Sequence, residues 1–441
     1  MRHILIAAAL MAACLGGAAC SSNTDDEATE TIPHRLGFTG AGNFPNDPIE
    51  QEELLESLGL SNEIQFNDAV LAHMEALSGL MARVEFFYLG NGEFVHIHES
   101  LSQKMLSAGF EIYGCINPIS PTESLDDAYD AALTDLVKIY PQITHWQIGN
   151  EPDLLWTDHS KFPAFFLRSQ PLVRAACPSC KILLAGISNQ YDTSSESHQR
   201  YESFLEEIAA AELSGRAFDV FDMHYYREKP TASEIAQAVP DLKALLEKHG
   251  LAQGVTFWCT ETGLYTGDPP SPDLGPRTEE EQAIDLARMV AWMSAAGIQR
   301  IFFWTLIEGY AGSVIPGFFD SMGLIYDGLG EESSRGIAGG TKKKAYTTYG
   351  LLGAALKNTS SPSKVSAGVY RFEGNQGPVF IIWDEGGGGS VSLTEISAPS
   401  VLVEDLVPDS QAETQEETLT VSQGGVTVTV GQSPKLVTIT Q

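Results

Sequence analysis

Residues 143–152 read ITHWQIGNEP, and the interpretation of the whole chain depends on this stretch. Its first half has the apolar and aromatic residues of a buried β-strand. The strand then meets Asn150 and Glu151, and Pro152 restricts the backbone that follows. A carboxylate at the end of a buried strand is costly to keep there unless chemistry uses it. The stretch therefore predicts a strand that delivers a functional carboxylate, and a partner is expected elsewhere in the chain.

The apolar run at 143–152 is one of eight along the chain, and helical segments lie between them. Segments such as residues 126–140 and 279–297 carry apolar side chains at the spacing of an amphipathic helix. Regular alternation of strands and helices is typical of a parallel sheet built from repeated βα units. The predicted strands are residues 34–40, 81–89, 110–117, 143–152, 181–188, 218–226, 255–263 and 298–306.

Eight strands that each precede helical sequence predict a (β/α)8 TIM barrel, an α/β fold, over residues 34–360. The alternative is an open doubly wound sheet, which should carry a G-x-G-x-x-G phosphate loop after its first strand. Residues 37–44 read GFTGAGNF, which contains glycines but neither that spacing nor an immediate helix. We therefore expect the barrel.

The pattern of apolar and polar residues changes after the predicted barrel. Residues 361–441 alternate apolar and polar side chains between Gly, Asn and Pro turns, without a helical period. This pattern predicts a small antiparallel β-sandwich. Such a domain either binds a polymer or covers the flank of the barrel. Because no exposed set of aromatic residues is evident in it, we favour the covering role.

The charge balance excludes some classes of partner. The chain has 26 Lys and Arg against 58 Asp and Glu, a formal net charge of -32. Nucleic acids and anionic membrane surfaces carry the same sign and are poor partners for such a protein. A neutral substrate fits the charge better.

The N-terminus has the features of an export signal. Residues 1–19 contain one Arg followed by an apolar stretch too short to span a bilayer, and small residues precede Cys20. This arrangement resembles a bacterial lipoprotein signal, which implies lipidation of Cys20, with Cys14 as an alternative acceptor and plain secretion as the other interpretation. Residues 20–33 are polar and acidic and predict a disordered tether. We expect an exported lipoprotein of the outer membrane that touches the membrane only through this anchor.

Four cysteines follow the tether. Cys177 and Cys180 form a C-x-x-C pair between a predicted helix and a predicted strand, where an exported protein can close a small disulfide. A redox-active pair should instead begin a helix, and a zinc site would need two further ligands. Cys115 and Cys259 lie on predicted strands and are expected to remain buried thiols.

The partner of Glu151 is expected at the same face of the barrel. In such barrels the catalytic residues lie at the C-terminal ends of the strands. The seventh predicted strand ends in TETG, which places Glu261 there. The sequence has no His and Asp cluster at metal-ligand spacing and no G-x-S-x-G motif, so we expect neither a metal nor another cofactor. Two carboxylates that flank one bond are what glycoside hydrolysis requires, because the leaving oxygen is protonated while the anomeric carbon is attacked.

The motifs GNEP at residues 149–152 and TETG at residues 260–263 resemble those of clan A glycoside hydrolases. These are retaining enzymes on a (β/α)8 barrel, and the likeness extends over the predicted barrel. The resemblance implies that Glu151 is the acid/base and Glu261 the nucleophile. A β-sandwich after the barrel is similar to several families of this clan.

The resemblance also implies roles for other residues at strand ends. Arg83 would support the nucleophile carboxylate and keep it ionised. His224 and Tyr226 would line the site and hydrogen-bond the nucleophile. Asn150 would bind the sugar hydroxyl next to the reacting carbon, and Trp304 would form an aromatic floor for the sugar ring.

The sequence thus predicts a retaining glycoside hydrolase that cleaves β-glycosidic bonds in a poly- or oligosaccharide by double displacement. Two alternatives use the same fold: a transglycosidase on the same residues, and an inactive sugar-binding lipoprotein. For a retaining pair the carboxyl groups should lie about 5 to 5.5 Å apart. Glu261 should be charged and Glu151 should have a raised pKa.

Overall fold

A computed structural model of the chain describes residues 35–440, apart from 43, 46–47, 79–80, 97, 120–124, 157, 189–195, 212, 214, 269–273, 310–317, 331–334 and 410–413. The expected signal peptide, the tether and Cys20 lie outside the described residues. Among the helices that are described, none is long and apolar enough to cross a bilayer.

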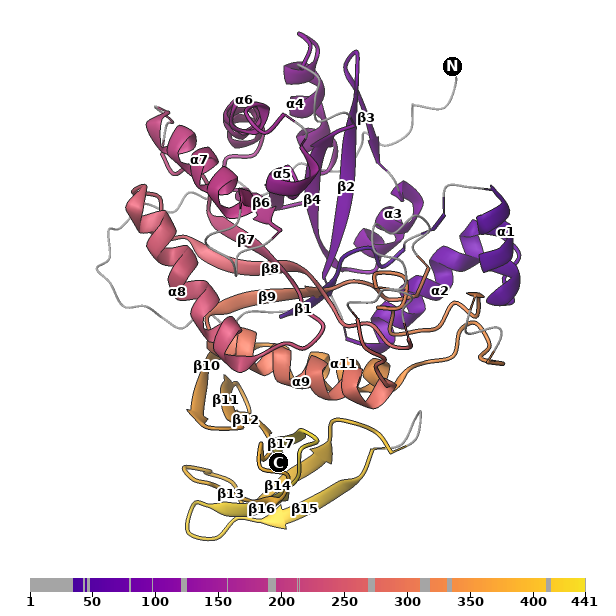
Figure 1. Cartoon of the computed structure of the whole chain (residues 1–441), viewed down its shortest axis with the longest axis vertical. Helices are drawn as coiled ribbons and strands as arrows, with labels where there is room; N and C mark the ends of the chain where they lie inside the picture. The colour runs from indigo at the N-terminus through magenta and orange to yellow at the C-terminus, as the bar shows by residue number, and fades with distance from the viewer. Residues whose placement is uncertain are drawn as a thin grey trace, which may run out of the picture. The chain divides into compact units, whose positions relative to one another are not determined.

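Eight parallel strands form a closed barrel (Figure 1). The sheet order is β1-β9-β8-β7-β6-β5-β4-β2-β3, and a further pairing of β1 with β2 closes the ring. This closure excludes the open doubly wound sheet and confirms the predicted TIM barrel. The barrel strands are β1 Leu36–Phe38, β2 Met81–Gly90, β4 Glu111–Pro118, β5 His145–Ile148, β6 Lys181–Ile187, β7 Val220–Tyr226, β8 Thr256–Gly263 and β9 Ile298–Phe303.

One strand of this sheet does not belong to the ring. β3, Glu93–His96, pairs with β2 in the antiparallel sense and forms a hairpin at the edge of the barrel. It is absent from the predicted strands because it has only four residues and alternates between exposed and half-buried positions. Without a buried face, a strand leaves little signal in the sequence.

The helices lie between successive strands. Their apolar faces pack onto the outside of the sheet, and α9 begins with a capping box between Thr278 and Glu281. The described helices are α1 Pro48–Ser57, α2 Glu63–Ala76, α3 Glu99–Ser107, α4 Tyr129–Ile139, α5 Pro152–Leu155, α6 Lys161–Ala176, α7 Glu196–Ala210, α8 Ala232–Lys248, α9 Glu279–Ala295 and α11 Lys344–Leu356.

The interior of the barrel is filled by large side chains near the N-terminal ends of the strands. Alternate residues of a strand point to the same side, so each barrel strand sends every second side chain inward. The buried interior cluster consists of Met81, Tyr113, Leu183, Val220, Trp258 and Phe302. This layer separates the ion pair of Glu111 with Arg300 at the bottom of the barrel from the polar side chains above it, towards the C-terminal ends of the strands.

The C-terminal region forms the predicted antiparallel β-sandwich. A six-stranded sheet has the order β10-β11-β12-β17-β14-β15, and a two-stranded sheet joins β13 to β16. Valine and isoleucine side chains from both sheets form one buried cluster. The strands are β10 Thr359–Ser366, β11 Val369–Gly374, β12 Gly377–Ile382, β13 Gly389–Leu393, β14 Ser400–Asp405, β15 Glu416–Thr420, β16 Val426–Val430 and β17 Lys435–Ile439.

The sandwich shares a continuous apolar core with the barrel helices. Trp383, after β12, packs edge-on against Trp292 of α9 with ring centroids 6.1 Å apart, and Tyr370 stacks on Trp383 at 5.2 Å. Arg288 of α9 lies over the Trp383 ring and donates to the carbonyl of Gln432 at 2.6 Å. These contacts agree with a domain that covers the flank of the barrel.

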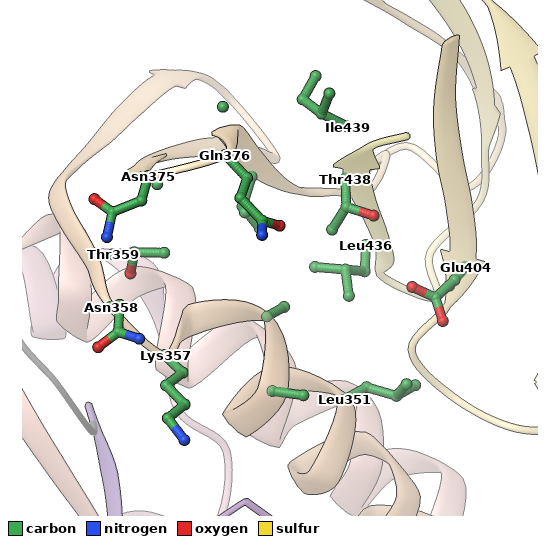
Figure 2. A pocket seen from close by; sticks show the side chains of 15 residues that line it. Leu351, Lys357, Asn358, Thr359, Asn375, Gln376, Glu404, Leu436, Thr438 and Ile439 are labelled. Atoms are coloured by element: carbon green, nitrogen blue, oxygen red, sulfur yellow. The ribbon is translucent and has the colours of Figure 1, made fainter. Parts of the chain in front are cut away.

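An open groove of about 540 Å³ runs between the C-terminal end of α11 and the six-stranded sheet (Figure 2). Figure 2 shows the amide side chain of Asn375 at one end, that of Gln376 near the middle and the carboxylate of Glu404 at the other end. None of the described residues that line it is aromatic, so the groove offers amides and aliphatic walls in place of a stacking surface for a sugar ring.

Cys177 and Cys180 form a disulfide in the loop between α6 and β6, at the end of the barrel opposite the strand termini discussed below. Cys115 and Cys259 are buried free thiols on β4 and β8. Burial raises the pKa of Cys115 to about 12, so this side chain remains a thiol at neutral pH.

Candidate active site

Above the apolar layer of the barrel, β2 and β7 present polar side chains to the interior. Alternate residues of β2 face the barrel interior. Met81 lies in the apolar layer, and Arg83 and Glu85 lie above it. Arg83 donates from Nη1 to Glu261 at 2.5 Å and from Nη2 to Glu85 at 2.6 Å. On β7 the same alternation places His224 inside the barrel. One buried guanidinium thus holds two carboxylates at the centre of the barrel mouth.

Glu151 stands just beyond β5 in an unusual backbone conformation. Its φ is 39° and its ψ 55°, the left-handed region that non-glycine residues rarely adopt. Such residues persist when their surroundings hold them and are frequent at active sites. Here Pro152 begins the short helix α5, and the carbonyl of Glu151 accepts from the backbone N–H groups of Leu154 and Leu155 at 3.0 and 2.7 Å. The turn directs the Glu151 carboxyl over the barrel.

Asp153 fixes this turn to the next part of the barrel. Its carboxylate is completely buried and accepts hydrogen bonds from the hydroxyls of Ser188, after β6, and Ser197, in α7, at 2.5 and 2.8 Å. The backbone N–H of Ser188 also donates to it. The fourth residue of the NEPD sequence is therefore a positioning residue, a role that the sequence analysis missed.

A β-bulge in β8 aims Glu261 into the barrel. In the register with β7, Met223 pairs with Cys259 and His224 pairs with Glu261, so β8 contains one additional residue, Thr260. The register with β9 shows the same extra residue. Regular alternation would send Thr260 inward and Glu261 outward, whereas the bulge lets both side chains face the interior.

The two predicted catalytic glutamates lie close together across the barrel mouth. One oxygen of Glu151, one oxygen of Glu261 and a nitrogen of His224 are all within 4.8 Å of one another. Tyr226 donates to Glu261 at 3.1 Å, as expected. The prediction for His224 needs a correction, because its Nδ1 hydrogen-bonds Glu151 at 2.7 Å and lies 3.5 Å from Glu261.

His224 is held from behind by a second carboxylate. Asp222, completely buried, accepts from the backbone N–H and the hydroxyl of Thr260 at 3.0 and 2.5 Å and lies 3.4 Å from His224 Nε2. The packing leaves no space beside them, because a Cβ at Gly186 would lie 2.6 Å from the Asp222 carboxylate. Asp222, which the sequence analysis missed, therefore orients the imidazole.

The surroundings drive the pKa values of the two glutamates apart. Burial raises the pKa of Glu151 above its ordinary value, although His224 opposes this rise. Burial acts in the same direction on Glu261, but the positive charges of His224 and Arg83 outweigh it and lower the pKa of Glu261. The two pKa values are thus shifted in opposite directions, which is the pattern of a proton donor paired with a nucleophile.

The carboxylates around the histidine between them favour its charged form. Burial by itself lowers the pKa of His224, but the carboxylates of Glu261 and Glu151, together with Asp222, raise it well above its ordinary value. Glu151, His224 and Glu261 are also residue types that bind zinc. A metal ion there would have to displace the proton of His224 and the guanidinium of Arg83, so this charge arrangement favours proton transfer over metal binding.

The remaining predicted residues surround this centre. The buried Oδ1 of Asn150 has no hydrogen-bond partner among the described residues. Trp304 follows β9, and its ring lies so near Gly40 that a Cβ there would come within 2.8 Å.

An aromatic cluster adjoins Trp304 and Tyr226. Tyr226 packs edge-on against Phe319 with ring centroids 5.0 Å apart, and Phe318 contacts Tyr265 at 5.5 Å. These phenylalanines extend the apolar wall of the site. The sequence analysis missed them, because they lie in the connection after β9, which has no strand or helix pattern.

No family model matches the chain, and the comparison with curated proteins gives no match. Solved structures do match. A family 39 glycoside hydrolase from Bacteroides cellulosilyticus WH2 is 14% identical over 93% of this chain and 81% of its own, with a TM-score of 0.62. A glucosidase from Croceicoccus marinus is 13% identical over 93% and 96% of the two chains, with a TM-score of 0.66. The GH51 arabinofuranosidase from Xanthomonas axonopodis pv. citri is 11% identical over 94% and 98%, with a TM-score of 0.55. At these identities the likeness shows a shared fold.

Proposed function

We propose that the protein is a retaining glycoside hydrolase that cleaves β-glycosidic bonds in a poly- or oligosaccharide. The observation that carries this proposal is the pair of carboxylates, Glu151 and Glu261, within 4.8 Å at the barrel mouth and with pKa values shifted in opposite directions. This closeness supports a retaining pair, because an inverting pair leaves room for a water molecule between its carboxyl groups. The glycoside hydrolases among the structural neighbours agree with the proposal.

In the first step the charged carboxylate of Glu261 attacks the anomeric carbon. The bond between that carbon and the glycosidic oxygen breaks, and the leaving oxygen takes the proton of Glu151. The products are a glycosyl ester on Glu261 and a free alcohol. Arg83 and Tyr226 hold the nucleophile in place through hydrogen bonds at 2.5 and 3.1 Å.

In the second step water replaces the departed alcohol. The Glu151 carboxylate accepts a proton from the water molecule, whose oxygen attacks the anomeric carbon and releases Glu261. Because each step inverts the anomeric carbon, the product keeps the configuration of the substrate. His224, hydrogen-bonded to Glu151 at 2.7 Å, keeps the carboxyl oriented while it exchanges its proton.

The stereochemistry of the product tests this mechanism. The protein is incubated with a panel of 4-nitrophenyl β-glycosides, and proton NMR follows the first sugar released, before mutarotation. We expect the β-anomer from each substrate that is cleaved. Initial release of the α-anomer would show inversion and reject double displacement.

We also propose that Cys20 carries a lipid that anchors the protein in the outer membrane, supported by the signal-like sequence before it and by Ser21 in place of an aspartate. Expressed in a Gram-negative host, the protein should fractionate with outer membranes. Cys20→Ala should release it or leave it unprocessed. Wild-type protein found soluble in the periplasm would contradict the anchor.

A further inference from the structure

Glu85 is a third carboxylate at the barrel mouth, and the mechanism does not use it. It follows Arg83 by two residues on β2, so both side chains face the barrel interior. One of its oxygens accepts from Arg83 at 2.6 Å. Its other oxygen has no hydrogen bond to a described residue and is available to a ligand.

Glu85 is more accessible than the catalytic pair. Its side chain is 35% exposed, compared with 13% for Glu151 and 12% for Glu261. An inward-facing side chain above the apolar layer can meet solvent only through the barrel mouth. Glu85 therefore lies between the entrance and the catalytic carboxylates, where it meets the substrate.

The cations of the site are already shared between carboxylates. Arg83 bridges Glu85 and Glu261, and His224 contacts Glu151, Glu261 and Asp222. Every Lys and Arg after Arg2 falls within the described residues, so the ion pairs of all the lysines and arginines near the site can be compared.

The next cations along the mouth are also engaged. Arg227, which follows β7, pairs with Glu234 at 3.8 Å. Lys343 is completely buried, where it pairs with Glu308 and donates to Thr266 at 2.7 Å. Lys229, which also follows β7, is exposed. A carboxylate on the substrate would therefore meet negative charge at Glu85, next to cations that are already paired with carboxylates.

We infer that Glu85 is a specificity-determining residue that accepts hydrogen bonds from the hydroxyls of a neutral sugar and excludes uronic acids. This inference rests on the proposed function. An ionised carboxylate is an acceptor only, and it matches the hydroxyl donors of a neutral sugar. Like charges brought together in a binding site cost several kcal/mol, enough to reject an anionic sugar.

Matched substrate pairs test the inference. The pairs are 4-nitrophenyl β-D-glucoside with the glucuronide, and the galactoside with the galacturonide, which differ only at C6. For the wild-type protein we expect kcat/KM for the neutral member to exceed that of the uronide by about a hundredfold or more. For Glu85→Gln we expect KM on the neutral member to rise about tenfold with little change in kcat, because a charge-assisted hydrogen bond is weakened. The preference for the neutral member should shrink by about tenfold.

Glu111→Gln is the matched control. Glu111 begins β4 at the opposite end of the barrel, pairs with Arg300 at 2.6 Å and has a side chain that is 25% exposed. Its loss removes the same kind of ion pair without touching the mouth. The preference for neutral sugars should then equal that of the wild-type protein, and thermal unfolding shows whether both variants fold.

Two results would overturn the inference while the proposed function stands: uronides cleaved as well as their neutral partners, or a preference that Glu85→Gln leaves unchanged. If the wild-type protein cleaves no member of the panel, the proposed function itself fails and the inference fails with it.

Discussion

Glu261→Ala is expected to abolish turnover of every glycoside that the protein cleaves, by about 10⁵-fold or more in kcat, the scale seen when a covalent nucleophile is removed. The carboxylate sits 2.5 Å from Arg83 and accepts from Tyr226, so it is held at the anomeric carbon in its charged form. Glu85 cannot take its place, because it binds the other nitrogen of the same guanidinium. Stopped assays with an aryl glycoside at high protein concentration measure the residual rate.

Added azide provides a second measurement on Glu261→Ala, because the substitution leaves space beside the anomeric carbon. Azide is a small anion that can occupy the place of the missing carboxylate and attack the anomeric carbon directly. From a β-glycoside in a single displacement it should give the α-glycosyl azide. Glu111→Ala, which breaks the Glu111 to Arg300 pair at the bottom of the barrel, is the control and should retain activity. Turnover by Glu261→Ala within tenfold of the wild-type rate would mean that another group is the nucleophile.

Glu151→Ala should have an effect that depends on the leaving group. An alcohol with a high pKa needs the proton of Glu151, so its release should slow by about 10² to 10⁴-fold. A nitrophenolate leaves without help, so formation of the glycosyl ester should be nearly preserved and its hydrolysis, which needs a base, should become limiting. Rates for a series of aryl glycosides, plotted against the pKa of the phenol, measure this dependence.

The response to azide and the pH dependence of the rate distinguish Glu151→Ala from Glu261→Ala. Azide needs no base, so it should accelerate Glu151→Ala and give the β-glycosyl azide, the opposite anomer to that from Glu261→Ala. The wild-type rate should fall as pH drops through the lowered pKa of Glu261 and as pH rises through the raised pKa of Glu151.

Glu151→Ala should keep the acid limb of this profile and lose the alkaline limb. Asp158→Ala, which removes an exposed carboxylate from the same βα loop, should keep both limbs. A Glu151→Ala profile identical to that of the wild-type protein would remove Glu151 from the acid/base role.

The barrel could be predicted because its strands are buried on both faces. Runs such as residues 182–187 are continuously apolar and each leads into helical sequence, which is the pattern that a parallel sheet imposes. β3 could not be predicted on the same basis, since its four residues bury no face. Sequence patterns report burial, and they miss elements that have little of it.

Within the site, residues at strand ends were predictable and the contacts behind them were not. Glu151 and Glu261 stand in short motifs at the ends of apolar runs. Asp153 and Asp222 are buried carboxylates, but in the sequence they cannot be distinguished from the many acidic residues of the surface. The hydrogen bond of His224 to Glu151 was missed, because Glu151 lies in a left-handed turn beyond β5, and a strand pattern does not reveal where that turn directs its carboxyl.

The extra residue in β8 has an evolutionary consequence. In β8, Trp258 belongs to the apolar layer that packs the barrel, and the extra residue Thr260 shifts the alternation so that Glu261 also faces the interior. Selection on folding and selection on catalysis therefore act on different residues of one strand. A substitution at position 261 would remove the proposed nucleophile without changing any side chain of the apolar layer.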